Sequence, residues 1–267
     1  LSPELTREIQ VTIYVLFIST GILTWDILSH LLDDYHMLAK EPLRTLIIIY
    51  FISRISCIGM LLTGFFTGPA EMDINCHITG IFLRIFFFLI VASTLGLFCL
   101  RARAICREHP FLRALLLVLW LASVGSCSVG FFVGDATESP DKGVSSCIAI
   151  LDDHFEAAVV VAIAAMVHDT AVFVIISWKM YKFICTPNHD TRKVVVFFIP
   201  THNDISPLLR CILQDGQLFY LISLFWEVLV TILALTPSLG PYYRFFMLPV
   251  HLIIVNSMAC HVFRNVR

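Results

Sequence analysis

Charged residues are scarce in this sequence: they make up 14% of 267 residues, whereas hydrophobic residues make up 58% and the mean hydropathy is +0.86. A soluble domain carries roughly 25% charged residues, so this chain has too few to cover a surface that faces water. Basic clusters are small and the net charge is -2, which disfavours a surface that binds nucleic acid. The composition therefore predicts an all-α integral membrane protein.

Several motifs of soluble enzymes and metal proteins are also missing. The sequence has no Gly-rich phosphate loop, no Asp-rich metal motif and no nucleophile motif. No two His residues share an apolar stretch at the i, i+4 spacing that is typical of a metal site. We therefore expect no metal and no cofactor.

Long apolar stretches fill most of the chain. A helix needs about 20 apolar residues to cross the bilayer core. Seven stretches have that length: 9–29, 44–66, 77–100, 112–134, 156–182, 213–236 and 241–263. They are continuously apolar rather than alternating, which favours helices over barrel strands. We predict a single seven-helix transmembrane domain over residues 1–267.

Lys and Arg are distributed unevenly between the two sets of connections. Thirteen of the 18 fall on the side of the C-terminus, and only Arg7, Lys142 and Arg244 fall on the other side. Because cytosolic connections are enriched in Lys and Arg, we expect the N-terminus outside and the C-terminus in the cytosol. The membrane would be the plasma membrane or an endomembrane.

Two of the nine cysteines, Cys76 and Cys147, fall on the predicted outer side. Cys76 opens the third predicted span, and Cys147 lies in the longest outer connection, just before the fifth. Outside the cytosol thiols oxidise readily, so we expect a disulfide that holds this connection over the mouth of the bundle. Two unpaired thiols are the alternative.

Ionisable side chains lie inside the predicted spans, where each costs on the order of 3 kcal/mol. They are Asp26 near the inner end of the first span, Arg54, Arg84, His168, Asp169, Glu227 and His251, and Trp226 stands beside Glu227. We expect these side chains to face the bundle interior and to pair, for example Arg54 or Arg84 with Asp169 or Glu227. The cluster would either bind a ligand, ion or proton, or only join helices through contacts worth about 0.6 kcal/mol each.

Six segments carry a resemblance to a known family: TWDILSHLLDDY (24–35), YFISRI (50–55), LRARAIC (100–106), LLRCILQDGQLFYLI (208–222), LTPS (235–238) and NSMACHVFRN (256–265). On these segments the chain resembles a large family of uncharacterised seven-span membrane proteins from mushroom-forming fungi. The resemblance runs from the first predicted helix to the C-terminus. It implies the seven-helix architecture and leaves the activity open.

The chain is also similar, more loosely, to rhodopsin-like G-protein-coupled receptors. The shared features are the seven spans, the outer N-terminus, the placement of Cys76 and Cys147, and a basic patch of Arg101 and Arg103 at the inner end of the third span. We interpret these arginines first as positive-inside anchors, and the alternative is that a cytosolic partner docks at them. No acidic residue directly precedes either arginine, and the last span has no Lys to bind retinal.

Three functions fit this pattern. The first, which we favour, is a receptor-like protein that binds a small apolar or amphipathic ligand at the polar residues inside the bundle. The second is a membrane enzyme that acts on a lipid-like or isoprenoid substrate by acid catalysis, as a terpene cyclase does. There Glu227 or Asp169 would be the acid, and His168 or His251 would relay protons. The third is a proton-coupled carrier that uses the same side chains.

Overall fold

A computed structural model describes residues 3–40, 45–67, 76–106, 108–133, 136–138, 147–149, 155–185, 207–236, 239, 243–244 and 246–265. The helices are α1 (Pro3–Ser29), α2 (Leu31–Lys40), α3 (Thr45–Thr67), α4 (Cys76–Ile105), α5 (Pro110–Val133), α6 (Phe155–Cys185), α7 (Pro207–Leu235) and α9 (Leu248–Asn265). Two short strands, β1 (Ala136–Glu138) and β2 (Cys147–Ala149), lie between α5 and α6.

Six of the helices in the described ranges are long and apolar enough to cross a membrane: α1, α3, α4, α5, α6 and α7. These helices confirm the first six apolar stretches of the sequence as helical segments of a multi-pass membrane protein. In the last predicted stretch the structure describes a shorter apolar helix, α9, which begins at Leu248, and its crossing of the membrane stays a prediction. Pro249 stands in the first turn of α9, where a missing backbone N–H costs no helical hydrogen bond.

Helix α2 was not expected from the apolar stretches. It follows α1 almost directly, since the backbone N–H of Asp34 donates to the carbonyl of His30 and that of His30 donates to Ile27. Met37 is buried against the bundle. The polar residues of α2 lower the mean hydropathy of this segment. A scale of transfer to lipid therefore ends the predicted helix at 29, before α2 begins.

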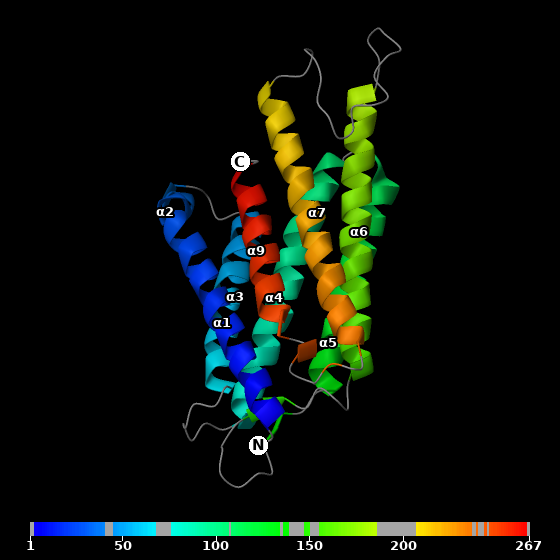
Figure 1. Ribbon diagram of the computed structural model, residues 1–267. Helices are drawn as coiled ribbons and strands as arrows, with labels where there is room; N and C mark the ends of the chain where they lie inside the picture. The colour runs from blue at the N-terminus through cyan, green and yellow to red at the C-terminus, as the bar shows by residue number, and fades with distance from the viewer. Residues whose placement is uncertain are drawn as a thin grey trace.

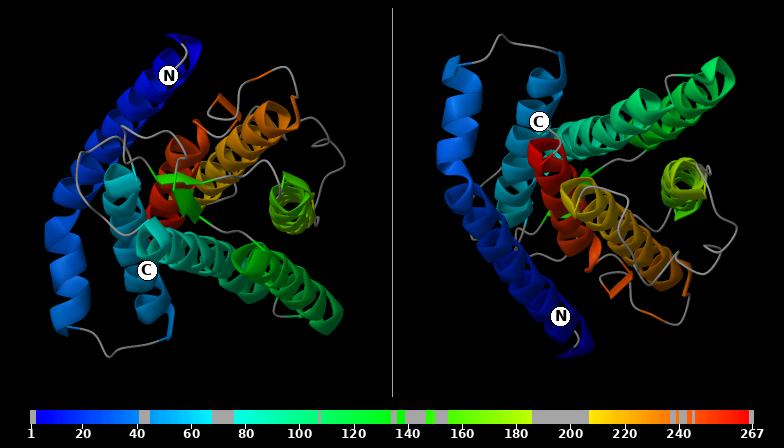
Figure 2. Two further views of the ribbon diagram at one scale, coloured as in Figure 1. Left: turned by 90° about the horizontal axis from the view of Figure 1, so that it is seen from below. Right: turned by 90° about the horizontal axis from the view of Figure 1, so that it is seen from above.

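Helices α4 and α9 lie at the centre of the bundle. Helix α4 contacts α3, α5, α6 and α9, and α9 contacts α1, α3, α4 and α7. The views along the bundle show α9 enclosed by these neighbours (Figure 2). The two chain ends lie at opposite ends of the bundle (Figure 1).

Large apolar side chains point outward from this bundle, and many polar ones point inward. Phe17, Leu28, Val118 and Phe225 are each more than half exposed. The buried set includes the polar and charged residues Ser53, Arg54, His168, Asp169, Ser223, Glu227, His251 and Asn256. Such a distribution suits helices whose outer faces meet lipid, because polar groups then find partners only inside the bundle.

Polar contacts also tie α5 to its two neighbours. The indole N–H of Trp120 donates to the carbonyl of Ala92 on α4 at 3.0 Å. The hydroxyl of Ser123 donates to the carbonyl of Ala164 on α6 at 3.0 Å. Each donor is thereby satisfied without water, which fits a helix within the bilayer.

The strands β1 and β2 form an antiparallel hairpin in which Glu138 pairs with Cys147. Both strands contact α4, the helix that begins at Cys76. The side chains of Cys76 and Cys147 lie outside those that the structure describes, so their disulfide stays a prediction. Among the described side chains, Cys57, Cys99, Cys106, Cys127 and Cys260 are free thiols.

Candidate functional site

Asp169 is the centre of a buried polar cluster between α6, α7 and α9. Its Oδ1 lies 3.0 Å from Nδ1 of the neighbouring His168, and the hydroxyl of Ser223 on α7 donates to its Oδ2 at 3.3 Å. Glu227 stands four residues after Ser223, which places both side chains on one face of α7. Its carboxyl group interacts electrostatically with that of Asp169. His251 on α9 interacts electrostatically with Asp169. We call these five residues the Asp169 cluster.

All five side chains are enclosed by protein, and His168 has no exposed surface. Three of their polar atoms have no hydrogen-bond partner among the described residues: Oε2 of Glu227, Nε2 of His168 and Nδ1 of His251. Buried polar groups in folded proteins are nearly always paired with protein or with a bound molecule. The Asp169 cluster therefore retains unused capacity to accept or donate hydrogen bonds.

The predicted pairing of Arg54 with Asp169 or Glu227 is wrong. Nη1 of Arg54 lies 2.9 Å from Oδ2 of Asp26 on α1, and its Nε lies 3.8 Å from Oδ2 of Asp34 on α2. Two acidic side chains contributed by α1 and α2 thus neutralise Arg54. It lies in a different group from Asp169.

This second group also includes Tyr50 on α3 and Arg264 on α9. The hydroxyl of Tyr50 donates to Oδ1 of Asp34 at 2.5 Å, and Nη1 of Arg264 donates to the oxygen of Tyr50 at 2.8 Å. Nη2 of Arg264 lies 3.8 Å from Oδ1 of Asp26. The two carboxylates and the two guanidinium groups balance in charge. We call these five residues the ion-pair group.

Arg84 and Trp226 do not make a direct contact with Asp169 that the structure resolves. Nε of Arg84 donates to the carbonyl of Gly80, one turn earlier in α4, at 3.2 Å. The Trp226 ring packs edge-on against that of Phe225, with centroids 6.4 Å apart. Of the seven predicted site residues, His168, Asp169, Glu227 and His251 therefore come together. Arg54 lies in a different group, and the described contacts of Arg84 and Trp226 are within their own helices.

A third polar contact, missed by the sequence analysis, lies between α3, α4 and α9. The side-chain amide of Asn256 donates to the hydroxyl of Ser53 and, at 3.4 Å, to that of Thr94. These two hydroxyls are 3.2 Å apart. Ser, Thr and Asn carry no formal charge, so a search for costly charges passes over them. Their presence in three different apolar stretches was the available signal.

At the end of α4, the two arginines of the basic patch have different surroundings. The guanidinium carbon of Arg101 lies over the ring of Tyr220 on α7, 5.8 Å from its centroid. Arg103 instead lines a groove on the outer face of α4. The two side chains therefore do not form one continuous described surface, and a partner that docks there stays a prediction.

Among the described side chains, no group of three or more His, Cys, Asp or Glu residues is placed to hold a metal ion. Neither a family model nor a curated protein matches this chain.

Proposed function

We propose that this chain is a receptor-like seven-helix membrane protein in which the Asp169 cluster receives the polar group of a small apolar or amphipathic ligand. The observation that supports it is the set of three unpartnered polar atoms on Glu227, His168 and His251. These atoms belong to side chains on three different helices: His168 on α6, Glu227 on α7 and His251 on α9. A ligand that joins these helices would bind differently to different arrangements of the bundle, which is the requirement for a signal.

The charge of the cluster selects the chemistry of the ligand. Asp169 and Glu227 bring two carboxyl groups into the cluster, and we propose that together they carry a negative charge. The arginine that could have neutralised this charge, Arg54, is bound to Asp26 instead. A hydroxyl or amine complements a negative site, and a carboxylate is repelled by it. We therefore propose an amphipathic alcohol or amine as the ligand class.

Helix α9 provides a connection from this cluster to the end of the bundle. His251 on this helix belongs to the Asp169 cluster, and Arg264, thirteen residues later, belongs to the ion-pair group. At 1.5 Å per residue the two side chains are separated by about 20 Å along the helix. A shift of α9 on ligand binding would change both groups at once, as helix shifts do in other switching proteins.

The proposal includes α9 as the seventh span, with the N-terminus outside and the C-terminus in the cytosol. Its 18 residues cover about 27 Å, close to the roughly 30 Å of the hydrocarbon core. The opposite positions of the chain ends in Figure 1 support an odd number of crossings. The resemblance to seven-span fungal membrane proteins and the disulfide between Cys76 and Cys147 belong to the same proposal.

A thermal-shift measurement tests the ligand class. The protein in nanodiscs is heated with a panel of long-chain alcohols, amines and carboxylates of matched chain length. We expect alcohols or amines to raise the melting temperature, carboxylates to leave it unchanged, and Glu227→Gln to remove the shift. A panel in which no member distinguishes the wild type from Glu227→Gln would count against ligand binding at this cluster.

A distance measurement tests the signal. Spin labels are attached at Leu218 on α7 and Phe111 on α5, both exposed positions on the outer face of the bundle. An alcohol or amine that raised the melting temperature should change the distance between the labels. If the distance distribution stays the same at saturating ligand, the protein binds the ligand without changing the arrangement of its helices, and the receptor proposal fails.

The alternative function is acid catalysis on a lipid-like substrate, and the electrostatic interaction between Asp169 and Glu227 favours it. A buried carboxylic acid can act as a proton donor, and the neighbouring His168 can return the proton. With an isoprenoid substrate panel, Glu227→Gln should abolish product formation while leaving the fold intact. Unchanged turnover in that variant would rule out this assignment.

A further inference from the structure

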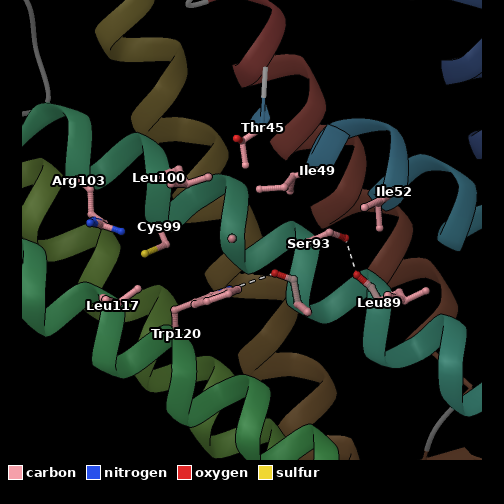
Figure 3. A pocket seen from close by; sticks show the side chains of 12 residues that line it. Thr45, Ile49, Ile52, Leu89, Ser93, Cys99, Leu100, Arg103, Leu117 and Trp120 are labelled. Atoms are coloured by element: carbon pink, nitrogen blue, oxygen red, sulfur yellow. Dashed lines mark hydrogen bonds between the residues drawn. The ribbon is translucent and has the colours of Figure 1, made fainter. Parts of the chain in front are cut away.

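A groove of about 330 Å³ runs along the outer face of α4, between α3 and α5. It is separate from the Asp169 cluster and the ion-pair group. Large apolar side chains form most of its walls (Figure 3): Ile49, Ile52, Leu89, Leu100, Leu117 and Trp120. Gly96, which has no side chain, lies in the α4 wall between them. A volume of this size holds part of a flexible chain or a small ligand.

In the middle of the groove, the polar groups of Trp120 and Ser93 are already satisfied within the protein. The Trp120 N–H donates to the carbonyl of Ala92, and the Ser93 hydroxyl donates to that of Leu89 (Figure 3). The ring of Trp120 therefore presents hydrocarbon to the groove. An occupant that brings polar groups to this part of the groove would lose their hydration without finding partners. The walls fit a hydrocarbon chain.

One end of the groove is different, because Arg103 stands there near the end of α4. Among the described residues, no carboxylate forms an ion pair with it. Leu89 lies at the other end of the groove. It precedes Arg103 by fourteen residues on α4, so the two residues are about 21 Å apart along the helix. One leaflet of a bilayer, with its headgroup layer, is about 20 Å thick. The groove thus matches a single lipid molecule in length and places a positive charge at headgroup level.

We infer that this groove is a binding site for an anionic phospholipid. One acyl chain lies along α4 beside Gly96 and Trp120, and the phosphate accepts hydrogen bonds from the guanidinium group of Arg103. A guanidinium group binds phosphate oxygens well because its N–H groups match them in spacing. A zwitterionic lipid fits the same groove but gains less from Arg103, because its headgroup has no net negative charge.

Quenching of Trp120 fluorescence by brominated lipids tests this site. The full chain is placed in phosphatidylcholine nanodiscs that contain increasing fractions of phosphatidylglycerol or phosphatidylcholine with brominated acyl chains. The contribution of Trp120 is the difference between the protein and its Trp120→Phe variant. We expect half-maximal quenching at an about fivefold lower fraction of the anionic lipid, since one Arg contributes about 1 kcal/mol to such binding.

Two pairs of variants identify the parts of the site. Arg103→Gln should abolish the preference for the anionic lipid, whereas Arg113→Gln, which removes an exposed charge near the same end of the bundle, should keep it. Gly96→Leu fills the groove beside Trp120 and should weaken quenching by both lipids, whereas Gly125→Leu, where a Cβ meets nothing within 4 Å, should not. Leu117→Phe narrows the groove from α5 without adding a second fluorophore and replaces Gly96→Leu if that variant does not fold.

Three results would overturn the inference. The first is equal quenching of the wild-type protein by the anionic and the zwitterionic lipid. The second is a preference that survives in Arg103→Gln or that disappears equally in Arg113→Gln. The third is unchanged quenching in a folded groove-filling variant. Because none of these measurements involves the Asp169 cluster, they stand or fall independently of the proposed receptor function.

Discussion

Arg54 on α3 and Asp26 on α1 form an ion pair at 2.9 Å, with side chains only 6% and 12% exposed. Arg264 on α9 reaches the same aspartate, so one carboxylate joins the first, third and last helices of the bundle. These helices are far apart in sequence. A contact of this kind fixes how α9 is positioned against α1 and α3.

Removal of one partner of this pair should be costly. Asp26→Ala leaves Arg54 buried with fewer counter-charges, and we expect it to lower the free energy of unfolding by about 3 kcal/mol, because an uncompensated buried charge is left behind. The double variant Asp26→Leu/Arg54→Met should recover most of this loss, since Asp34 and Arg264 still balance each other. Thermal denaturation in one detergent compares the three proteins.

The pair of Glu108 and Lys179, at 3.7 Å, provides the control, because the Glu108 side chain is 85% exposed although that of Lys179 is only 12% exposed. Glu108→Gln should change the stability by less than about 1 kcal/mol, because water solvates the exposed carboxylate and weakens its Coulomb attraction to the lysine. If Asp26→Ala and Glu108→Gln prove equally mild, the ion-pair group does not hold the helices together.

Tyr50 couples the two halves of the ion-pair group through one oxygen atom. Tyr50→Phe removes its hydrogen bonds to Asp34 and Arg264 and keeps the ring, which packs against Phe263 at 5.4 Å. We expect a loss of about 2 kcal/mol, the scale of hydrogen bonds to charged groups. Tyr14→Phe, at an exposed position on α1, should stay within about 0.5 kcal/mol of the wild type. Similar melting temperatures for the two variants would contradict this role of the hydroxyl.

The sequence predicted the helices well because bilayer thickness sets their length. The stretch at 44–66, for example, corresponds to Thr45–Thr67 in α3. For the last stretch, 241–263, hydropathy is a poorer guide, because it measures transfer to lipid and not backbone conformation. Pro249 lies inside this apolar stretch and stands in the first turn of α9, which begins at Leu248. Hydropathy alone does not show where such a helix begins.

The position of a charged residue along its predicted span did not predict which residue it contacts. Arg54, Asp169 and Glu227 are all central in their apolar stretches, which suggested a pairing. Depth gives the position along a helix, however, and not the direction in which a side chain points or the neighbour that it meets. Asp34 lies in α2, outside the predicted spans, and was therefore not considered as a partner. Asp169 and Glu227 do meet, because α6 and α7 are neighbours.

The variant Ser53→Ala tests whether the contact of Ser53, Thr94 and Asn256 between α3, α4 and α9 stabilises the bundle. Ser53→Ala removes the acceptor of the Asn256 amide and the contact with Thr94. We expect a loss of about 0.6 to 1.7 kcal/mol, the range for polar contacts between helices in lipid. Ser29→Ala is the matched control, because that hydroxyl bonds only the carbonyl of Trp25 in its own helix. A larger effect at Ser29 than at Ser53 would show that the contact is dispensable.

Gly59 determines how closely α3 approaches α4. A Cβ at this position would lie 2.5 Å from the ring of Phe86, whereas a Cβ at Gly125 on α5 meets nothing within 4 Å. Gly59→Ala should therefore destabilise the protein by about 1 to 3 kcal/mol, because the aromatic ring must move out of its packed position. Gly125→Ala should raise the stability by up to about 1 kcal/mol, because Ala favours the helix over Gly. The two changes are chemically identical, so opposite shifts in melting temperature isolate the packing at α3 and α4. If both variants become more stable, then Phe86 yields freely and the close approach of these helices is not set by Gly59.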